Sequence, residues 1–381
     1  MKILTIDVGT GTQDIFLYDS RLDIENGYKL VLPSPTMMVR QQILAATKAE
    51  RDIVLTGVTM GGGPCGWAVN GHIASGFRTF ATPDAARTVN DDLNMIKEMG
   101  VILVSEEEAG SLHNNVVRIE LGDFNFRQIE EAFALFGVDL SDLVAVAVAV
   151  FDHGNAPADV SDRKFRFEYL DQRIRAENRL SAFAYLSNQI PEIMTRLQAV
   201  ADSAKDLRTP LVVMDTAPAA ILGATYDPSF RDHNRVMIAN IGNFHTLAFR
   251  LGPSGIEGVF EHHTGILDPI ALDEYIYEFA QGTLTNDRVY SDHGHGALIY
   301  TQESLSMDHS DFNIIVTGPR RNMVKNSRFR PFFAVPFGDM MLSGCFGLLS
   351  AVADVLPNLA EPIYKSLNAN KGHNTEPWQL D

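Results

Sequence analysis

A glycine- and threonine-rich turn follows the first apolar segment of the chain, and an aspartate precedes it. Residues 2–7 have the sequence KILTID, and the turn consists of Gly9, Thr10, Gly11 and Thr12. Glycines at a hairpin tip let backbone N–H groups approach a phosphate, and threonine hydroxyls add donors. A carboxylate would repel a bare phosphate, so Asp7 indicates a bridging cation, Mg²⁺ bound through water. The alternative is a tight hairpin with an aspartate before its turn.

A second turn of this kind follows a later apolar segment. Residues 235–239 (RVMIA) precede Asn240, and Gly242 and Asn243 form the turn. We predict that this turn holds the other side of the same phosphate chain, because Asn240 precedes it as Asp7 precedes the first turn. An amide binds a metal ion less well than a carboxylate, and a purely structural turn fits the pattern as well.

Two further aspartates follow apolar segments that favour buried strands. Asp215 comes after residues 210–214 (PLVVM), and Asp152 comes after residues 143–151 (LVAVAVAVF). Open α/β sheets place their sites at the carboxyl ends of strands, where an aspartate can act as a general base towards a hydroxyl nucleophile. Asp215 fits a helix N-cap equally well. Asp152 is an alternative base or a ligand of the substrate.

A third glycine-bearing segment lies nearer the C-terminus. Residues 312–316 (FNIIV) precede Thr317 and Gly318, and a segment of small residues around Gly344 and Gly347 follows. A strand that ends in glycine beside a helix of small residues can admit a flat purine, since no side chain blocks the approach. Thr317 and Gly318 are therefore candidate nucleotide-binding residues, although many α/β loops share the pattern.

Aspartate and histidine occur together in two glycine-containing loops. One has the sequence Asp152-His153-Gly154, and the other has the sequence Asp292-His293-Gly294-His295. Imidazoles and carboxylates at strand ends can bind a divalent metal. They support a rival hypothesis, a metal-dependent hydrolase that uses Asp152, His153, His293 and His295. No closely spaced motif of the HExxH type supports it, and polar loop histidines explain the pattern too.

The elements that position these residues occur in a repeated order. A strand, a glycine turn, two strands, a helix and a strand are predicted once from residue 2 and again from residue 235. Duplication of one α/β unit is the simplest explanation, with a first domain at 1–230 and a second at 231–381. The first copy is longer, and most of its additional residues would be an insertion at about 65–205. Within it, residues 173–204 are helical in pattern, and Pro191 should bend or break that helix.

Together and in this order, the four motifs resemble the superfamily of actin, hexokinase and the heat-shock chaperone ATPases. The matching segments are residues 7–12, 215–220, 240–246, 314–318 and 338–347. The resemblance covers roughly residues 1–60 and 205–356, and it departs from the usual pattern at Asn240, where an aspartate is usual, and at Pro319, where a glycine is usual. The chain is also similar to a prokaryotic family labelled as an activating enzyme of pyruvate formate-lyase. True activating enzymes need three clustered cysteines, which Cys65 and Cys345 cannot supply.

The resemblance implies a fold and a chemistry. The fold is α/β, with two ribonuclease-H-like domains around a nucleotide cleft, the actin-like ATPase fold, and a large insertion in the first domain. The implied cofactors are ATP and Mg²⁺, and hexokinase-like members use an aspartate at the place of Asp215 as catalytic base. We therefore expect a phosphotransferase or ATPase that acts on a small hydroxylated or carboxylated substrate. The alternative within this fold is a degenerate, non-catalytic nucleotide-binding protein.

Composition limits the partners. The 381 residues contain 31 Lys and Arg against 48 Asp and Glu, a net charge of −17. This charge argues against nucleic acid and against an anionic membrane surface, because both require clustered cations. A phosphate must then be held by backbone N–H groups and a metal ion. No signal-peptide pattern and no apolar run of about 18 residues is present, so we expect a cytoplasmic protein. The sequence leaves the oligomeric state open.

Overall fold

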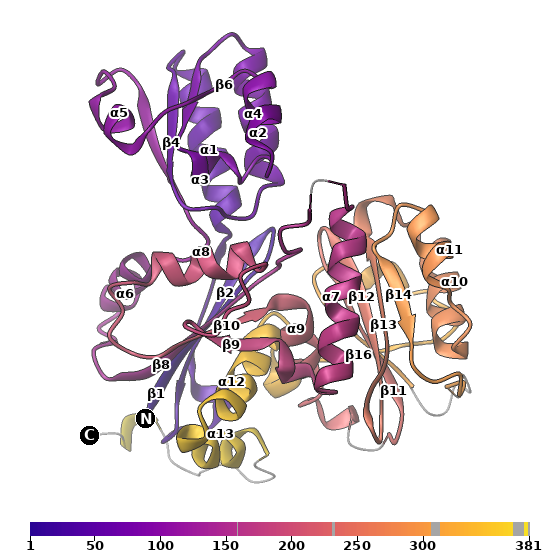
Figure 1. Cartoon of the computed structure of the whole chain (residues 1–381). Coiled ribbons are helices and arrows are strands. Elements are labelled where there is room, and N and C mark those ends of the chain that lie inside the picture. The colour runs from indigo at the N-terminus through magenta and orange to yellow at the C-terminus, as the bar shows by residue number, and fades with distance from the viewer. Residues whose placement is uncertain (158, 231–232, 306–312, 369–376, 380–381) are drawn as a thin grey trace.

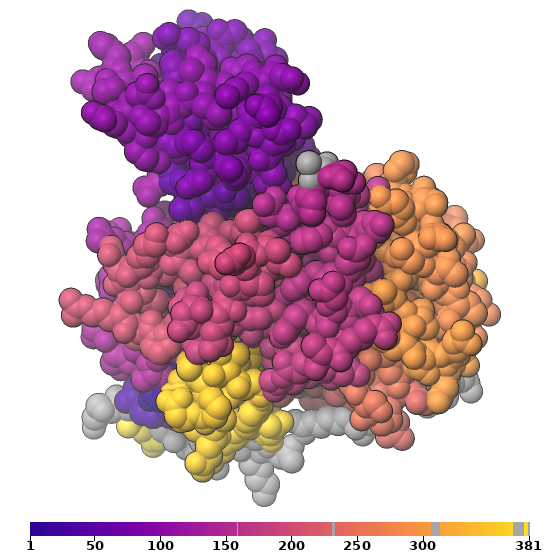
Figure 2. Space-filling view, viewed as in Figure 1, coloured from indigo at the N-terminus to yellow at the C-terminus, as the bar shows by residue number. Residues whose placement is uncertain are grey.

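Three β-sheets organise the chain (Figure 1). The computed structural model describes residues 1–157, 159–230, 233–305, 313–368 and 377–379. Two of the sheets have six strands each, and the third has four. The four-stranded sheet forms a separate lobe that projects from the body of the molecule, as the space-filling view shows (Figure 2).

The first six-stranded sheet has the order β3-β2-β1-β8-β10-β9. Strands β1, β8 and β10 are parallel, whereas β2 pairs antiparallel with β1 and β3 pairs antiparallel with β2. Its central strand β8 is apolar throughout because both faces are covered. The strands are β1 (Lys2–Val8), β2 (Thr12–Asp19), β3 (Tyr28–Pro33), β8 (Leu143–Val150), β9 (Ala184–Leu186) and β10 (Leu211–Asp215).

The second six-stranded sheet has the order β14-β13-β12-β11-β15-β16. Strands β11, β15 and β16 are parallel, and β12 and β13 form an antiparallel meander beside β11. The strands are β11 (Val236–Ile241), β12 (His245–Gly252), β13 (Gly255–His263), β14 (Gly296–Ile299), β15 (Ile314–Thr317) and β16 (Phe332–Phe333).

The two six-stranded sheets contain the same unit of five strands. In each, the spatial order is third, second, first, fourth, fifth, with the first three antiparallel and the last two parallel to the first. This is the topology of a ribonuclease-H-like domain. The predicted α/β fold of two such domains, the actin-like ATPase fold, is therefore confirmed.

The four-stranded sheet corrects the expected position of the insertion. Its strands are all parallel in the order β6-β5-β4-β7, and it has a hydrophobic core of its own. The insertion is thus smaller than 65–205 and begins earlier, and β8 belongs to the first sheet. Its elements are α1 (Pro35–Lys48), β4 (Ile53–Gly57), α2 (Pro64–Ala74), β5 (Thr79–Ala81), α3 (Pro83–Ala86), α4 (Leu93–Glu98), β6 (Val101–Leu103), α5 (Glu106–Ser111) and β7 (Val117–Leu121). We call residues 35–121 the inserted domain.

Helices join the two ribonuclease-H-like domains into one core. Buried residues of the first sheet, of α9 and α12 and of one face of the second sheet form a single cluster, while α10 covers the other face of the second sheet. Helix α12 therefore returns to the first domain, although its sequence lies within the predicted second domain. The helices are α6 (Phe126–Ala134), α7 (Asp162–Ala176), α8 (Thr195–Ser203), α9 (Thr216–Ala224), α10 (Pro269–Gln281), α11 (Asn286–Ser291), α12 (Ser343–Val355) and α13 (Ala360–Leu367).

Within the described ranges, no single helix has the length and apolar character needed to cross a bilayer. One pair of consecutive helices, residues 343–355 and 357–367, is together long and apolar enough, but the pair is bent by 114° at the break between them. The first helix of this pair, α12, is buried from Ser343 to Ala353 by the rest of the protein.

Candidate functional site

A cavity of about 370 Å³ lies where loops of the two ribonuclease-H-like domains and the inserted domain meet. Glycine-bearing loops line it, among them residues 9–12, 61–63, 151–154, 242–245 and 317–319. The structure thus brings together Asp7 and all of the residues predicted to bind the nucleotide. Those residues are Gly9, Thr10, Gly11, Thr12, Gly242, Asn243, Thr317 and Gly318. Their binding role remains a prediction.

The turns of the two equivalent hairpins face each other across this cavity. Gly9 N–H donates to the Thr12 carbonyl at 2.9 Å, and Gly242 N–H donates to the His245 carbonyl at 2.9 Å, so the two turns have the same closing bond. The tips are close together, since a Cβ atom on Gly11 would lie 2.8 Å from the Asn243 side-chain nitrogen. The two turns were predicted to form two sides of one site, and in the structure they lie next to each other.

Two carboxylates lie beneath the first turn. Asp7 on β1 is directly opposite Asp14 on β2, and both line the cavity. Burial raises the pKa of Asp7 to about 6, although Thr216 donates a hydrogen bond to it at 2.5 Å. Burial and the nearby charge of Asp7 raise the pKa of Asp14 to about 8. One oxygen of Asp14 has no hydrogen-bond partner among the described residues. Asp14 was not predicted as a site residue, although a carboxylate directly before the run Ile15–Tyr18 of a buried strand is a signal for it.

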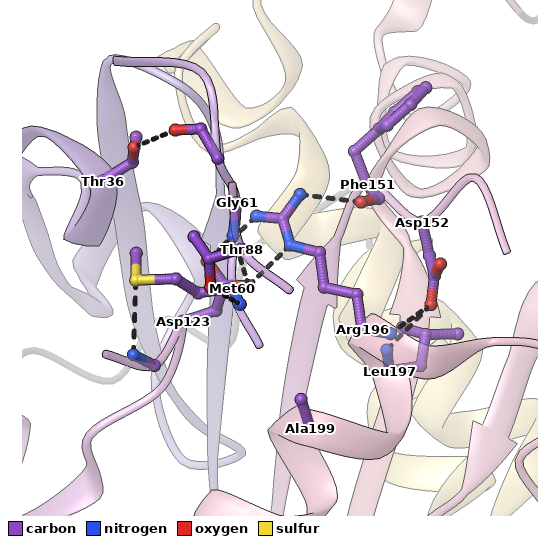
Figure 3. Close-up of polar contacts among 12 residues, drawn as sticks. Thr36, Met60, Gly61, Thr88, Asp123, Phe151, Asp152, Arg196, Leu197 and Ala199 are labelled. Atoms are coloured by element: carbon purple, nitrogen blue, oxygen red, sulfur yellow. Dashed lines mark hydrogen bonds and ion pairs between the residues drawn. The ribbon is translucent and has the colours of Figure 1, made fainter. Parts of the chain in front are cut away.

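Asp152 lies at the cavity wall and holds the start of α8 (Figure 3). Its carboxylate accepts backbone N–H groups from Gly154 at 2.8 Å and from Arg196 and Leu197 at 2.9 Å each. Burial raises its pKa in spite of these bonds. The predicted base therefore lines the cavity, and its oxygens bind the backbone just after β8 and the first turn of α8.

The Arg196 side chain connects the inserted domain to the first sheet (Figure 3). It donates to both oxygens of Asp123, at 2.6 and 2.9 Å, and to the Phe151 carbonyl at 2.7 Å. Asp123 in turn accepts the Gly61 N–H at 3.2 Å, which fixes the glycine loop that follows β4. Sequence reasoning did not identify this ion pair, because its two residues are far apart in the chain.

Asp215, the other predicted base, lies behind the cavity and is not one of its lining residues. One oxygen accepts the Ala217 N–H at 2.9 Å, which makes Asp215 the N-cap of α9. The other oxygen accepts a hydrogen bond from the Arg166 guanidinium at 2.6 Å. The structure therefore shows the capping contact that the sequence also allowed, and a catalytic role for Asp215 remains a prediction.

A cluster of histidines adjoins the site. His153 and His245 line the cavity, and His295 lies buried behind them. Their ring nitrogens lie within 4.8 Å of one another. The predicted ligand His293 is exposed, with a φ of 63°, and is not a member of this group. His245 is in the group instead, although the sequence suggested it only as a residue of the second turn.

Glu261 on β13 faces the same cluster. Its Oε1 atom lies 3.2 Å from His245 Nδ1 and 3.6 Å from His295 Nε2. Burial would raise the pKa of Glu261, but the Arg166 guanidinium, at 2.8 Å, and the imidazoles hold it well below its usual range. Burial lowers the pKa of His295 to about 3 and that of His153 well below its usual value. Burial thus favours the neutral form of His153 and His295, whereas the Arg166 guanidinium favours the ionised form of Glu261.

A family model matches residues 60–323, which include most of the inserted domain, strand β8, the histidine cluster and most of the second sheet. The family is described as "Putative pyruvate format-lyase activating enzyme (DUF1786)". The chain belongs to this family. No curated protein matches the sequence. In this family member both cysteines, Cys65 and Cys345, are free and buried.

Several solved structures are similar to this family member at low identity. The activator of 2-hydroxyisocaproyl-CoA dehydratase from Clostridium difficile, with bound ADPNP, is 7% identical, covers 97% of this chain and 99% of its own, and has a TM-score of 0.34. A ROK family glucokinase from Streptomyces griseus, with glucose and AMPPNP, is 11% identical, with coverages of 93% and 99% and a TM-score of 0.31. A ROK hexokinase from Thermus thermophilus is 11% identical, with coverages of 95% and 100% and a TM-score of 0.28.

Proposed function

We propose that this protein binds ATP with Mg²⁺ and acts as a phosphotransferase or ATPase on a small hydroxylated or carboxylated substrate. The observation that carries the proposal is the pair of equivalent hairpin turns, Gly9–Thr12 and Gly242–His245, which face each other across one cavity. Duplicated turns that meet at a shared space are suited to the two sides of a phosphate chain, because each contributes backbone N–H groups.

Asp7 and Asp14 fit a hard cation beside those phosphates. Oxygen ligands are what Mg²⁺ prefers, and it commonly keeps several waters. The two carboxylates are opposite each other, and the unpartnered oxygen of Asp14 is available to a water of the ion. When bound, the ion would neutralise charge on the phosphates, which is the main requirement of phosphoryl transfer. Thr317 and Gly318, at the end of β15, are the proposed neighbours of the purine.

The inserted domain and the first sheet are the proposed substrate side of the cavity. Asp152, Asp123 and the backbone of residues 61–63 line this side. We assign the base role to Asp152 first, because it lies at the cavity, and keep Asp215 as the second candidate. The family description names an activator of a radical enzyme, but a cluster held by three or four thiolates of one chain cannot form from two cysteines.

The direct test is calorimetric titration with ATP in the presence and absence of Mg²⁺. We expect binding that Mg²⁺ strengthens, and we expect Asp7→Asn to lower the Mg²⁺-dependent affinity about tenfold or more, because a charge-assisted contact contributes about 1.5–3 kcal/mol. The matched control is Asp206→Asn, which removes an exposed carboxylate from outside the cavity. If ATP does not bind at millimolar concentration, the proposal is wrong.

The rate of ATP turnover shows whether Asp152 or Asp215 is the base, and whether the protein is catalytic at all. ATP consumption is measured with a panel of small hydroxylated and carboxylated acceptors. We expect Asp152→Asn to lower turnover at least about 100-fold, the usual contribution of a general base, while ATP still binds. If Asp215→Asn has that effect and Asp152→Asn does not, the base is Asp215. Tight ATP binding without turnover on any acceptor would favour a nucleotide-binding protein without catalysis.

A further inference from the structure

Four side chains that could bind a metal converge next to the cavity from four separate segments. His153 follows β8, His245 begins β12, Glu261 lies on β13, and His295 immediately precedes β14. His153 Nε2 lies 3.1 Å from His295 Nε2. Glu261 Oε1 lies 3.6 Å from His295 Nε2 and 3.2 Å from His245 Nδ1. The three histidine nitrogens lie within 4.8 Å of one another, and Glu261 adjoins two of these histidines.

We propose that His153, His245, His295 and Glu261 form a binding site for a divalent transition metal ion such as zinc. Zinc binds imidazole nitrogen and carboxylate oxygen through bonds of about 2.0–2.2 Å, so a tetrahedral ion separates its ligand atoms by about 3.3 Å. The three measured separations of 3.1, 3.2 and 3.6 Å lie around this value. The three histidine nitrogens lie within 4.8 Å of one another, so binding one ion requires the rings to rotate towards it.

The charges at the cluster favour a cation. The Arg166 guanidinium donates to Glu261 at 2.8 Å and to Asp215 at 2.6 Å, and all three side chains are buried. One positive charge is therefore shared between two carboxylates. Two buried carboxylates against one guanidinium leave an excess of negative charge at this place. A divalent ion bound by Glu261 would offset it.

The contacts within the cluster do not explain its arrangement by hydrogen bonding alone. Glu261 Oε1 and His245 Nδ1 are 3.2 Å apart, yet neither has a hydrogen-bond partner among the described residues. His295 Nδ1 is also buried without such a partner. Buried polar atoms are usually paired, because leaving one unpaired destabilises the folded protein. An ion bound by Glu261 Oε1 and His245 Nδ1 would satisfy both atoms.

The position of the cluster gives the ion access to the cavity. His153 and His245 line the cavity, whereas His295 and Glu261 lie behind them. The ion would thus lie at the cavity wall. There a water or an anionic oxygen of a small molecule could bind it as a fifth ligand or in place of one of the four side chains. This metal site is separate from the proposed Mg²⁺ at Asp7 and does not depend on ATP binding.

The test uses the full-length protein without nucleotide. Protein dialysed against a chelator and then freed of it is titrated with Zn²⁺ by calorimetry and with Co²⁺ by visible absorption. We expect one ion per chain, with the intense visible bands of four-coordinate Co²⁺. His153→Gln and His245→Gln should each lower the Zn²⁺ affinity at least about 100-fold, since even indirect partners of a metal ligand contribute 10–100-fold. Zn²⁺ should also raise the melting temperature of the wild type but not of these variants.

The matched control is His293→Asn. His293 is two residues from His295 but exposed and outside the cluster, and asparagine tolerates its positive φ. This variant should bind Zn²⁺ as the wild type does. The proposal is overturned if the wild type binds no ion stoichiometrically, if both cluster variants bind with unchanged affinity, or if His293→Asn weakens binding as much as they do. Circular dichroism of each variant shows that it folds, and two substitutions on different segments keep the test valid if one does not.

Discussion

The imidazole of His72 makes the stability of the inserted domain depend on pH. His72 lies on α2, its Nδ1 atom is 2.7 Å from the Thr47 hydroxyl on α1, and it is 1% exposed. Burial lowers its pKa below the usual 6.5. Below that pH the unfolded chain therefore binds a proton that the folded protein does not, so the free energy of unfolding decreases as the pH falls through about 6.5 and below.

We predict that His72→Gln loses less stability than the wild type when the pH is lowered from about 7.5 to about 5. Glutamine does not titrate, so the linked proton is absent from its unfolded state. Urea denaturation at both pH values measures the difference, with His113→Gln, an exposed histidine of the same domain, as control. Equal losses in the wild type and in His72→Gln would contradict the prediction.

Site residues that are close together in the chain could be predicted from the sequence, whereas contacts between residues far apart in the chain could not. Asp7 and the glycines of the two turns follow directly from a strand and its turn, so their position could be read from neighbouring residues. The partners Arg196 and Asp123 are 73 positions apart. Glu261 and Arg166, 95 positions apart, meet only because α7 packs against the second sheet. No spacing rule in the sequence connects such residues.

Small residues allow α9 and α12 to touch through their backbones. A Cβ atom on Gly347 would overlap the Ala219 carbonyl oxygen, and one on Gly223 would overlap the Ser343 carbonyl oxygen. These overlaps involve backbone atoms, which cannot move aside as a flexible side chain can. The two helices carry Thr216 and Ser343, which line the cavity, so this contact also fixes one wall of the site.

We predict that Gly347→Ala lowers the free energy of unfolding by about 1–3 kcal/mol or more, because it overpacks this helix crossing. The matched control is Gly71→Ala on the exposed side of α2, where a Cβ atom meets nothing within 4 Å. There alanine should stabilise the protein by about 0.5–1 kcal/mol, since it restricts the unfolded chain. Thermal and urea unfolding measure both. A neutral Gly347→Ala would show that the crossing is looser than described.

Helices and strands were predicted correctly where the local hydrophobic pattern allowed only one kind of element. Apolar runs such as residues 143–150 and 211–214 are buried strands, and the order of elements from residue 2 recurs from residue 235. The helical pattern at 173–204 was wrong in part: α7 ends at Ala176, β9 follows, and α8 begins at Thr195. Residues 53–57 were predicted as a strand, and they form β4. Their apolar character could not indicate that β4 belongs to the four-stranded sheet and not to the sheet of β1. Sheet membership depends on contacts between distant segments.

Over the whole molecule, three units enclose the cavity. The first sheet contributes the Gly9–Thr12 turn, the second sheet contributes the Gly242–His245 turn, and the inserted domain contributes residues 59–64. The inserted domain also touches the second turn, since the Trp67 and Phe244 rings meet edge to face with centroids 5.5 Å apart. The Asn243 side chain lies against Gly11, between the tips of the two turns. We therefore expect nucleotide binding to displace the second turn, as domain movements around bound ligands commonly do.

We predict that this movement changes the fluorescence of Trp67. The chain has two tryptophans, so Trp378→Phe leaves Trp67 as the single reporter. Trp67 is 62% exposed and has Phe244 at its edge. If ATP separates the turns, Trp67 loses this contact and its emission shifts to longer wavelength. Adding Phe244→Leu should produce the shifted emission without ATP and remove most of the response to it. Calorimetry under the same conditions establishes saturation, and unchanged Trp67 emission at saturating ATP would show that the nucleotide enters without separating Trp67 from Phe244.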